Sequence, residues 1–385
     1  MSDPADILVL NTGSSSVKFA VFDAQLNERI SGVAEGIGGQ GQLRIGDQTE
    51  ALDLPGHSAA LAAVLEQLTL RGAGGAGSLR AVAHRVVHGG TSLTRPTRIT
   101  AEIRQEIQAC IPLAPLHNPH AVLAIDAMEH LAPALPQYAS FDTAFHASAP
   151  EVASRYALPA EAEALGLRRY GFHGLSYASI CRCLPQISAA PVPERLLAFH
   201  LGNGASICAI HNGRSVATTM GYSPLEGLTM GTRVGTLDAN AALRLVEDFG
   251  LDRTKVLLNN QSGLAGLSGG ISDMRALEET DTPEAQFAIA HFCYWAIRHG
   301  HSMIGAMGGC DAIVFTGGIG ENARSIRASI LDGFAWLGCR LDPQSNADSA
   351  PCLTTPSSTV TAWIAPAEEE RQIAMDASGL ITGVT

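Results

Sequence analysis

Two segments of this chain share a strand–turn–strand pattern that limits the folds it can adopt. Residues 7–23, ILVLNTGSSSVKFAVFD, and residues 196–211, LLAFHLGNGASICAIH, each place apolar runs on both sides of a turn of small residues. An offset of 189 residues brings Asn11 onto His200 and Gly13 onto Gly202. Each segment predicts a β-hairpin. A repeat of this length indicates two duplicated domains, because solenoid repeats are much shorter.

A third glycine-rich segment lies at residues 312–322, AIVFTGGIGEN. It predicts a strand, a turn and then a helix over residues 323–337. Free N–H groups at a helix N-terminus favour phosphate binding, although a GGxG pattern alone has low specificity. The other expected elements are helices at 58–70, 120–131, 238–249 and 284–307, with glycine-rich loops or turns at 36–54 and 71–78.

Composition and charge exclude several classes of function. The chain has 25 Lys and Arg against 37 Asp and Glu, a net charge of −12, which disfavours nucleic acid as a partner. No run of roughly 18 apolar residues predicts a membrane span, and the acidic N-terminus lacks a signal-peptide pattern. Eight cysteines without a CxxC pair predict reduced thiols. We therefore expect a soluble, cytoplasmic protein with no membrane partner.

Several charged residues are candidates for chemistry. Lys18 is one of two lysines and lies beside the first glycine turn, where an ammonium group is a compact phosphate ligand and chance is the alternative. In residues 81–90, AVAHRVVHGG, strand alternation places Arg85 and Val87 on one face and His84 and His88 on the other. A guanidinium beside a methyl shelf suits a small carboxylate with a short alkyl tail. An ordinary ion pair at the end of a sheet is the alternative.

A zinc site at the histidines is disfavoured. His84 and His88 lie in a strand-like context, and Pro119 interrupts the pair His117 and His120. Neither pair has the thiolates or the HExxH spacing that zinc sites use.

Three further polar residues stand among small residues in a chain with few charges. They are Asp142 in FDTAFH, His173 in YGFHG and Arg233 in MGTRVG. Capping, core packing or surface exposure would explain each alone. Together with Arg85 they indicate a functional site, because charge is costly to keep where burial is the norm.

The motifs NTGSSSVKF, HRVVHGG, LAPLHNP, FDTAFH, YGFHG, HLGNGAS, PLEGLTMGTR and TGGIGEN, with a late EEE segment, occur in the order seen in acetate kinases. The resemblance runs from about residue 7 to residue 375 and is specific to kinases of acetate, propionate and butyrate. It implies an α/β fold of two duplicated actin-like (ribonuclease H-like) domains around a nucleotide cleft, and a homodimer. The expected domains are residues 1–147, completed by residues 371–385, and residues 148–370.

The resemblance also implies a Mg²⁺-dependent transfer of the ATP γ-phosphoryl group to acetate, giving acetyl phosphate and ADP. Because acetate is already ionised at neutral pH, the reaction requires no general base. The implied catalytic residues are Asp142 as the acidic residue, His173 as the stabiliser of the transition state, and Arg85 and Arg233 as the pair that holds acetate and the phosphoryl group. Asn11 and Glu369 would organise Mg²⁺, with Mn²⁺ as an alternative ion.

The remaining implied residues line the two substrates. For ATP or ADP they are Ser14, Ser16, Lys18, His200, Leu201, Gly202, Asn203, Gly204, Asp273, Met274, Arg275, Gly318, Ile319, Gly320, Glu321 and Asn322. For the organic acid they are Arg85, Val87, Leu116, His117, Phe172 and Pro224.

The chain departs from the family pattern in two places. Val234 and Thr236 stand where the family has Ser and Asp, so an acidic side chain near the acyl or phosphate site is missing. The late segment reads Glu368, Glu369, Glu370, so the register of the magnesium-linked glutamate is open by one residue.

Other functions remain as alternatives at this stage. A propionate or butyrate kinase differs from an acetate kinase by one or two methylenes, which a small pocket discriminates weakly. A noncatalytic actin-like ATP switch would share the hairpins but would not need Arg85 and Arg233 directed at a small acid. A sugar or glycerol kinase would need a base for its neutral hydroxyl group.

Overall fold

The computed structural model describes residues 5–73 and 78–383 and separates them into two compact units. The first unit runs to Phe145 and resumes at Glu368, and the second unit is His146–Ala367. No helix in the described residues has the length and apolar composition needed to cross a bilayer.

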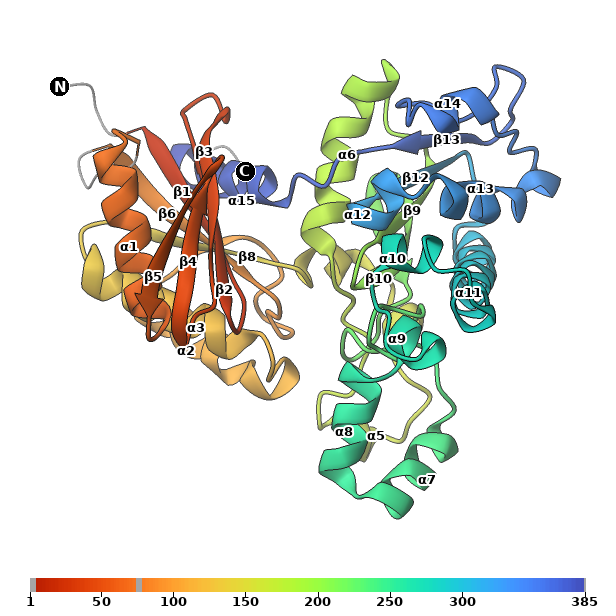
Figure 1. Ribbon diagram of the computed structural model, residues 1–385, viewed down its shortest axis with the longest axis horizontal. Coiled ribbons are helices and arrows are strands. Elements are labelled where there is room, and N and C mark those ends of the chain that lie inside the picture. Colours follow the sequence, from red (N-terminus) through yellow and green to blue (C-terminus); the bar gives the residue numbers. More distant parts are fainter. Residues whose placement is uncertain (1–4, 74–77, 384–385) are drawn as a thin grey trace. The chain divides into compact units, whose positions relative to one another are not determined.

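The first unit is built on one sheet, with the strand order β5-β4-β3-β2-β1-β6-β8-β7. Strands β1 to β5 form an antiparallel meander, β6 and β8 add in parallel beyond β1, and β7 is antiparallel to β8. The elements are β1 (Asp6–Thr12), β2 (Ser16–Phe22), β3 (Glu28–Glu35), β4 (Gly39–Ile45), β5 (Gln48–Leu54), α1 (His57–Leu70), β6 (Leu79–Val86), β7 (Thr97–Arg98), α2 (Ala101–Ala109), η1 (Ile111–Leu113), α3 (Asn118–Leu131), β8 (Gln137–Phe141) and α15 (Glu369–Thr382) (Figure 1).

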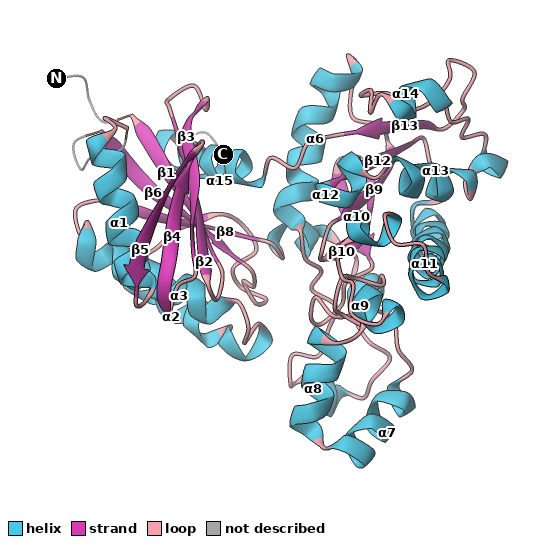
Figure 2. Ribbon diagram, in the orientation of Figure 1, coloured by secondary structure: helices cyan, strands magenta, loops and turns pink. Residues whose placement is uncertain are grey.

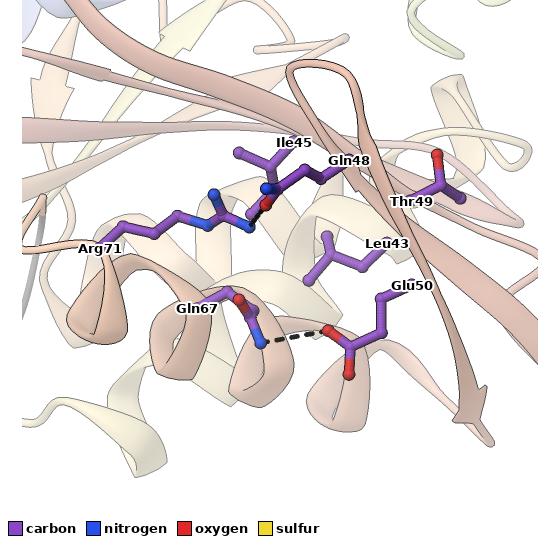
Figure 3. Close-up of a pocket in the computed structure, with 7 residues that line it drawn as sticks. All are labelled: Leu43, Ile45, Gln48, Thr49, Glu50, Gln67 and Arg71. Atoms are coloured by element: carbon purple, nitrogen blue, oxygen red, sulfur yellow. Dashed lines mark hydrogen bonds between the residues drawn. The ribbon is translucent and has the colours of Figure 1, made fainter.

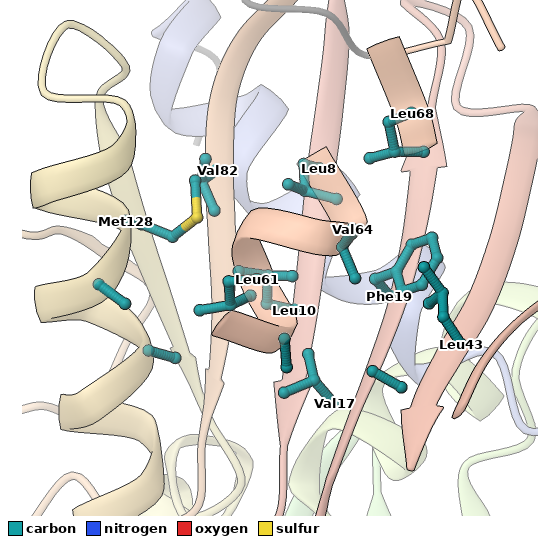
Figure 4. Close-up of a cluster of buried hydrophobic side chains, with 14 of the residues drawn as sticks. Leu8, Leu10, Val17, Phe19, Leu43, Leu61, Val64, Leu68, Val82 and Met128 are labelled. Carbon is teal, nitrogen blue, oxygen red and sulfur yellow. The ribbon is translucent and has the colours of Figure 1, made fainter. Parts of the chain in front are cut away.

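The core of this unit lies between the sheet and helices α1 and α3. Leu61 and Val64 of α1 reach toward Leu10 and Phe19, which are cross-strand partners on the same face of β1 and β2 (Figure 4). Burying each such side chain contributes about 1.5–3 kcal/mol. The C-terminal helix α15 packs against β1, β6 and β8, so the end of the chain returns to the strands that begin it.

The second unit contains a five-stranded sheet, with the order β11-β10-β9-β12-β13. Its longest helix, α11, packs on the antiparallel strands of this sheet. The elements are η2 (Ala144–Ser148, which begins at the division between the units), α4 (Glu151–Ser154), α5 (Ala160–Glu163), α6 (Gly174–Ser188), β9 (Arg195–Leu201), β10 (Ala205–His211), β11 (Arg214–Thr218), α7 (Ala239–Phe249), α8 (Leu251–Asn260), α9 (Gly263–Ser268), α10 (Met274–Glu278), α11 (Pro283–Met307), β12 (Ala312–Thr316), α12 (Gly317–Asn322), α13 (Arg324–Asp332), η3 (Ala335–Leu337), α14 (Pro343–Ala347) and β13 (Thr361–Ile364) (Figure 2).

The two sheets share one topology. In the first unit β3, β2 and β1 are antiparallel and β6 and β8 follow in parallel. In the second unit β11, β10 and β9 are antiparallel and β12 and β13 follow in parallel. The duplication that the sequence offset predicts is therefore confirmed, and both predicted hairpins occur, with turns between β1 and β2 and between β9 and β10.

Local signals explain the helix that the sequence predicts best. The side chain of Thr282 accepts a hydrogen bond from Ala285 N, Pro283 stands in the first turn, and Gly308 ends the helix with φ +73°. A capping hydroxyl, a proline in the first turn and a left-handed glycine are the usual boundaries of a helix. The four predicted helices are confirmed as α1, α3, α7 and α11.

Two predictions of local structure are wrong. Residues 36–54 were expected to be loops, but they contain the β4–β5 hairpin. Gly41 lies within β4. A Cβ at this position would come within 2.4 Å of the Glu35 carbonyl oxygen, so glycine here permits close approach of the strands and does not mark a turn. The glycines after β12 form the short helix α12 instead of the expected turn, whereas the helix expected over 323–337 is present as α13 (Arg324–Asp332), followed by η3 (Ala335–Leu337). Of the expected loop at 71–78, residues 74–77 lie outside the described residues.

Candidate active site

The first glycine turn is held by a histidine from α1. Gly13 N donates to the Ser16 carbonyl at 2.8 Å, and the His57 side chain donates through Nε2 to the Gly13 carbonyl at 2.8 Å. Asn11 and Lys18 are cross-strand partners, so their side chains leave the same face of the hairpin. His57 is a residue that sequence reasoning missed, because the contact spans 44 positions and has no local signal.

Arg85 lies at the end of β6 and is ion-paired. Its Nε and Nη2 donate to both oxygens of Asp142, at 3.0 and 2.7 Å, and its Nη1 lies 3.1 Å from Glu369 Oε2. Burial alone would lower the pKa of Arg85, but the Asp142 and Glu369 carboxylates raise it, so the guanidinium keeps its charge. Burial alternates as the sequence predicts, with Arg85 and Val87 half-buried and His84 and His88 buried.

The three consecutive glutamates at the start of α15 have different surroundings. Glu369 pairs with Arg85 and its side chain is 12% exposed. Glu368 pairs with Arg371 at 3.1 Å. The Glu369 carboxylate directly contacts Arg85, and the charge of Glu370 also acts on that guanidinium.

Leu116 and His117, which are expected near the organic acid, directly precede α3. His117 precedes the first residue of the helix, and its charge acts on Asp142. Leu116 is 58% exposed. Both belong to the first unit, as do Arg85 and Val87.

In the second unit His173 takes a backbone conformation that is rare for its residue type. It precedes α6 with φ +58° and ψ +23°, in the left-handed region. Its ring stacks on His200 with centroids 4.1 Å apart, and its Nδ1 is hydrogen-bonded to Ser206 Oγ at 2.9 Å. The Tyr177 hydroxyl is hydrogen-bonded to the same Ser206 oxygen. Strained backbone of this kind is typical of functional positions.

Arg233 differs from Arg85 because no carboxylate lies within ion-pair distance of it in the described residues. Its Nη1 donates to the Pro224 carbonyl at 3.2 Å, and burial lowers its pKa. A Cβ built on Gly204 would lie 3.5 Å from Arg233 Nη1 and 3.4 Å from His173 Nε2. The Arg233 guanidinium and the His173 ring therefore both lie beside the glycine turn at Gly204. Any side chain at Gly204 would occupy space next to these two groups.

Phe172 and Pro224, the two apolar residues expected beside the organic acid in this unit, each have a hydrogen-bonded carbonyl group. Phe172 is 1% exposed, and its carbonyl accepts a hydrogen bond from His146 Nε2 at 2.9 Å. Burial lowers the pKa of His146 to about 4, so this histidine is neutral at neutral pH. Pro224 is half-buried and presents its carbonyl to Arg233.

A cavity of about 450 Å³ lies between three segments of the second unit. The β9–β10 turn, the start of α10 and helix α12 each supply part of its wall. Its volume lies within the range of small-ligand sites. The residues that line it are Gly202, Asn203, Ser272, Asp273, Met274, Arg275, Glu278, Gly318, Ile319, Asn322 and Ala323.

Most of the residues expected to contact nucleotide in this unit line that cavity, and a few do not. Leu201 is buried in β9, and Gly320 is buried in α12. The Glu321 carboxylate instead accepts hydrogen bonds from Gly317 N and Ala367 N. Its role is therefore to brace the helix.

Arg327 is a second residue that sequence reasoning missed. Its guanidinium is fully buried and donates to the carbonyls of Gly320 and Glu321, at 3.0 and 2.8 Å, and to Asn346 Oδ1. It fixes the C-terminal carbonyls of α12, the helix that walls the cavity. Because Arg327 lies in the interior of a predicted helix, nothing in the sequence around it indicates its hydrogen bonds to the Gly320 and Glu321 carbonyls.

The departures from the family pattern at residues 234 and 236 face another cavity. Val234 and Thr236 line it together with His291 and Trp295 of α11. The Thr236 hydroxyl donates to the Gly227 carbonyl at 3.1 Å and is hydrogen-bonded to His299 Nε2. Neither residue lines the cavity beside Gly202 and Asn203.

A third cavity, between the β4–β5 hairpin and α1, has no predicted site residue on its walls. Its polar side chains satisfy one another, with Arg71 donating to Gln48 at 2.6 Å and Gln67 to Glu50 at 3.2 Å (Figure 3). We assign it no function.

The repeated sheet topology and the cavity at a glycine-rich turn define a duplicated α/β protein of the actin-like class. The sequence matches the acetokinase family over residues 6–375. The acetate kinase of Rhodopseudomonas palustris is 43% identical over 385 aligned residues, which cover 96% of each chain. The chain belongs to the acetokinase family.

Solved structures of similar sequence have the same fold. Porphyromonas gingivalis acetate kinase is 35% identical and superposes with a TM-score of 0.91, over 98% of this chain and 100% of that one. A propionate kinase from Francisella tularensis is 34% identical with a TM-score of 0.91, over 97% and 98% of the two chains.

Proposed function

We propose that this protein is an acetate kinase, which transfers the γ-phosphoryl group of ATP reversibly to acetate. The observation that carries the proposal is Arg233, a half-buried guanidinium without a carboxylate partner in the described residues, beside His173 at the Gly204 turn. A desolvated cation that the protein leaves unpaired is suited to an anionic ligand. The adjacent residues of that turn, Gly202 and Asn203, line the cavity of about 450 Å³ that we assign to the nucleotide.

The reaction joins two anions. A carboxylate oxygen of acetate attacks the γ-phosphorus, the bond from that phosphorus to the β,γ-bridging oxygen breaks, and ADP leaves. No proton needs to be removed from the ionised acid, so Asp142 acts by orienting Arg85 through two hydrogen bonds. Arg233 and Arg85 neutralise the repulsion between carboxylate and phosphate, which is the main barrier to an in-line transfer.

His173 can donate a hydrogen bond to the transferred group. When Tyr177 donates to Ser206 and Ser206 donates to His173 Nδ1, the ring carries its proton on Nε2. That nitrogen is the one directed at Gly204. The polar chain thus fixes a donor where charge develops.

The donor set of the first unit has the chemistry that Mg²⁺ prefers. Asn11 and Glu369 offer oxygen ligands, and α15, which begins at Glu369, packs against the strand that carries Asn11. The described residues contain no group of three or more His, Cys, Asp and Glu that could hold a metal ion. Mg²⁺ commonly takes only one or two protein carboxylates and completes its shell with water and substrate phosphates. When bound, it neutralises the phosphates; Mn²⁺ would do the same.

Glu369→Gln is expected to raise the Mg²⁺ concentration for half-maximal activity at least about tenfold, because a neutral amide binds a hard cation less strongly than a carboxylate. Initial rates measured across a magnesium titration at saturating ATP and acetate test this. Glu368→Gln and Glu370→Gln are the matched controls and should shift the midpoint little. A larger shift in either control than in Glu369→Gln would move the metal assignment to that residue.

Acetate is expected to be the preferred acid, with propionate as a weaker substrate. One extra methylene in an apolar pocket changes selectivity by about 10- to 200-fold. Trapping of the acyl phosphate as its hydroxamate, with acetate, propionate and butyrate in parallel, gives kcat/KM for each acid.

The same assay separates the proposal from its competitors. A clear preference for propionate or butyrate would replace acetate as the substrate. ADP release that is equal with and without acid would contradict a kinase of organic acids.

Three further properties complete the proposal. The two compact units would correspond to the two duplicated domains of the family, with boundaries near residues 147 and 370. The protein would act in the cytoplasm as a homodimer. Helix α7 has no buried residue, and Leu243, Phe249 and Leu251 are each more than half exposed, which supports burial of this face against a second copy.

A further inference from the structure

The loop that carries Pro224 has no regular structure of its own. Residues 219–237 contain neither helix nor strand, and their backbone is held by separate hydrogen bonds to other segments, such as those from Tyr170 N to the Gly221 carbonyl and from Gly231 N to the Asn203 carbonyl. The Pro224 carbonyl in this loop is the single hydrogen-bond acceptor of the Arg233 side chain in the described residues. The position of the Pro224 carbonyl therefore bears directly on the Arg233 guanidinium.

The hydroxyl group of Tyr156 holds the loop at two points. It donates to Glu226 Oε2 at 2.6 Å and accepts from Tyr222 N at 3.0 Å. These two contacts lie on either side of Pro224 in the sequence. Burial first, and then the hydrogen bond to Glu226, raises the pKa of Tyr156 to about 12, so the phenol stays protonated and remains a donor at any working pH.

Gly221 lies directly beside the contact between Tyr156 and Glu226. A Cβ on Gly221 would lie 1.8 Å from Glu226 Oε2 and 2.4 Å from the Tyr156 hydroxyl oxygen. A side chain at Gly221 would therefore displace the Glu226 carboxylate or the Tyr156 hydroxyl from this contact.

Arg169 contacts both Tyr156 and Glu226. Its guanidinium carbon lies 4.3 Å from the centroid of the Tyr156 ring, and its Nη2 donates to Glu226 Oε1 at 3.4 Å. Glu226 is the sole carboxylate in residues 219–237, the stretch that contains Arg233. Tyr156 and Arg169 each bind one of its oxygens, and Glu226 forms no ion pair with Arg233 in the described residues.

We propose that Tyr156, Glu226 and Arg169 form a positioning group that sets the Pro224 loop and keeps the Arg233 guanidinium available to the anionic substrate. The three residues do not contact the reacting atoms; they act through Arg233. This inference rests on the proposed function, in which Arg233 meets the acid and the phosphoryl group.

Tyr156→Phe removes one oxygen atom and leaves the ring under Arg169. We expect kcat/KM for acetate to fall roughly tenfold, because a small misplacement of a binding group is costly in catalysis. The KM for ATP should stay within about twofold, because the nucleotide cavity is walled by other segments. Glu226→Ala should match Tyr156→Phe. Glu226→Gln should recover activity to within about threefold of wild type, since the amide oxygen can still accept the Tyr156 hydrogen bond that joins Glu226 to Tyr222.

A double-mutant cycle with Arg233→Ala separates positioning from general stability. If Tyr156 acts through Arg233, then Tyr156→Phe should cause no further loss in the Arg233→Ala background, whereas independent effects would multiply. Tyr294→Phe, at an exposed position of α11, is the control and should behave as wild type. The Glu226 pair of variants provides the same comparison if Tyr156→Phe does not fold.

Three outcomes would overturn the inference. They are a Tyr156→Phe protein with normal kcat/KM for acetate, equal losses for acetate and ATP, or losses that multiply in the double mutant. A wild-type protein that forms no acyl phosphate from any acid would refute the proposed function itself, and the inference with it, and the wild-type assay alone would reveal this.

Discussion

Replacing Arg233 with alanine is expected to lower kcat roughly 10²- to 10³-fold, the loss typical of removing one preorganised donor at a developing charge. The fold should survive, because this guanidinium makes one hydrogen bond to a carbonyl and no ion pair in the described residues. Removing it therefore leaves no carboxylate buried without its partner. The measurements are single-turnover and steady-state rates by hydroxamate trapping, together with thermal unfolding.

Arg214→Ala is the matched control, since Arg214 lies in the same unit and is exposed at the start of β11. It should leave both kcat and Tm unchanged. Arg233→Lys should give an intermediate rate, because lysine keeps the charge and loses the planar fork that holds two oxygens. Near-normal turnover of Arg233→Ala would remove this residue from the mechanism.

Replacing Arg85 with alanine is expected to affect both rate and stability. Stability is affected because Arg85 neutralises Asp142, whose side chain is 3% exposed, and also contacts Glu369. Removing one partner of a buried ion pair costs about 3–5 kcal/mol of unfolding free energy. Catalysis should fall by at least roughly 10²-fold.

The double variant Arg85→Ala with Asp142→Ala separates the two effects. Removing both charges should recover most of the lost stability, as measured by urea unfolding, because no uncompensated carboxylate remains. Activity should not return. A double variant as unstable as Arg85→Ala would show that the stability loss comes from packing, and a recovery of activity would remove Arg85 from the substrate clamp.

Much of the secondary structure is predictable from the residues because side-chain period follows backbone geometry. Alternation over Val17, Phe19 and Val21 indicates a strand with one buried face, and these residues are buried in β2. The helix 283–307 has its cap, proline and final glycine within its own sequence. The β4–β5 hairpin was missed because Gly41 serves close strand packing, and Gly36, Gly38 and Gly46, which have positive φ, lie at the ends of strands and not within a long loop.

The candidate site could be predicted only in part. Motifs identify which residues carry chemistry, and the segments around Gly202, Asp273 and Gly318 do come together at one cavity. The hydrogen-bond and ion-pair partners of the site residues could not be predicted. Arg85 and Asp142 are 57 positions apart, and Tyr156 and Glu226 are 70 apart, so no local pattern links them.

The amino-acid sequence by itself determined the duplicated α/β plan, the positions of its hairpins and long helices, and the residue types at the glycine turns. Tertiary structure alone decided that Arg85 is paired and Arg233 is not, and that Glu369 rather than its neighbours meets Arg85. Glu368 precedes α15, and successive helix residues such as Glu369 and Glu370 point about 100° apart, so these carboxylates face different directions. Only the packing of α15 on β1 and β6 selects which of them faces the site.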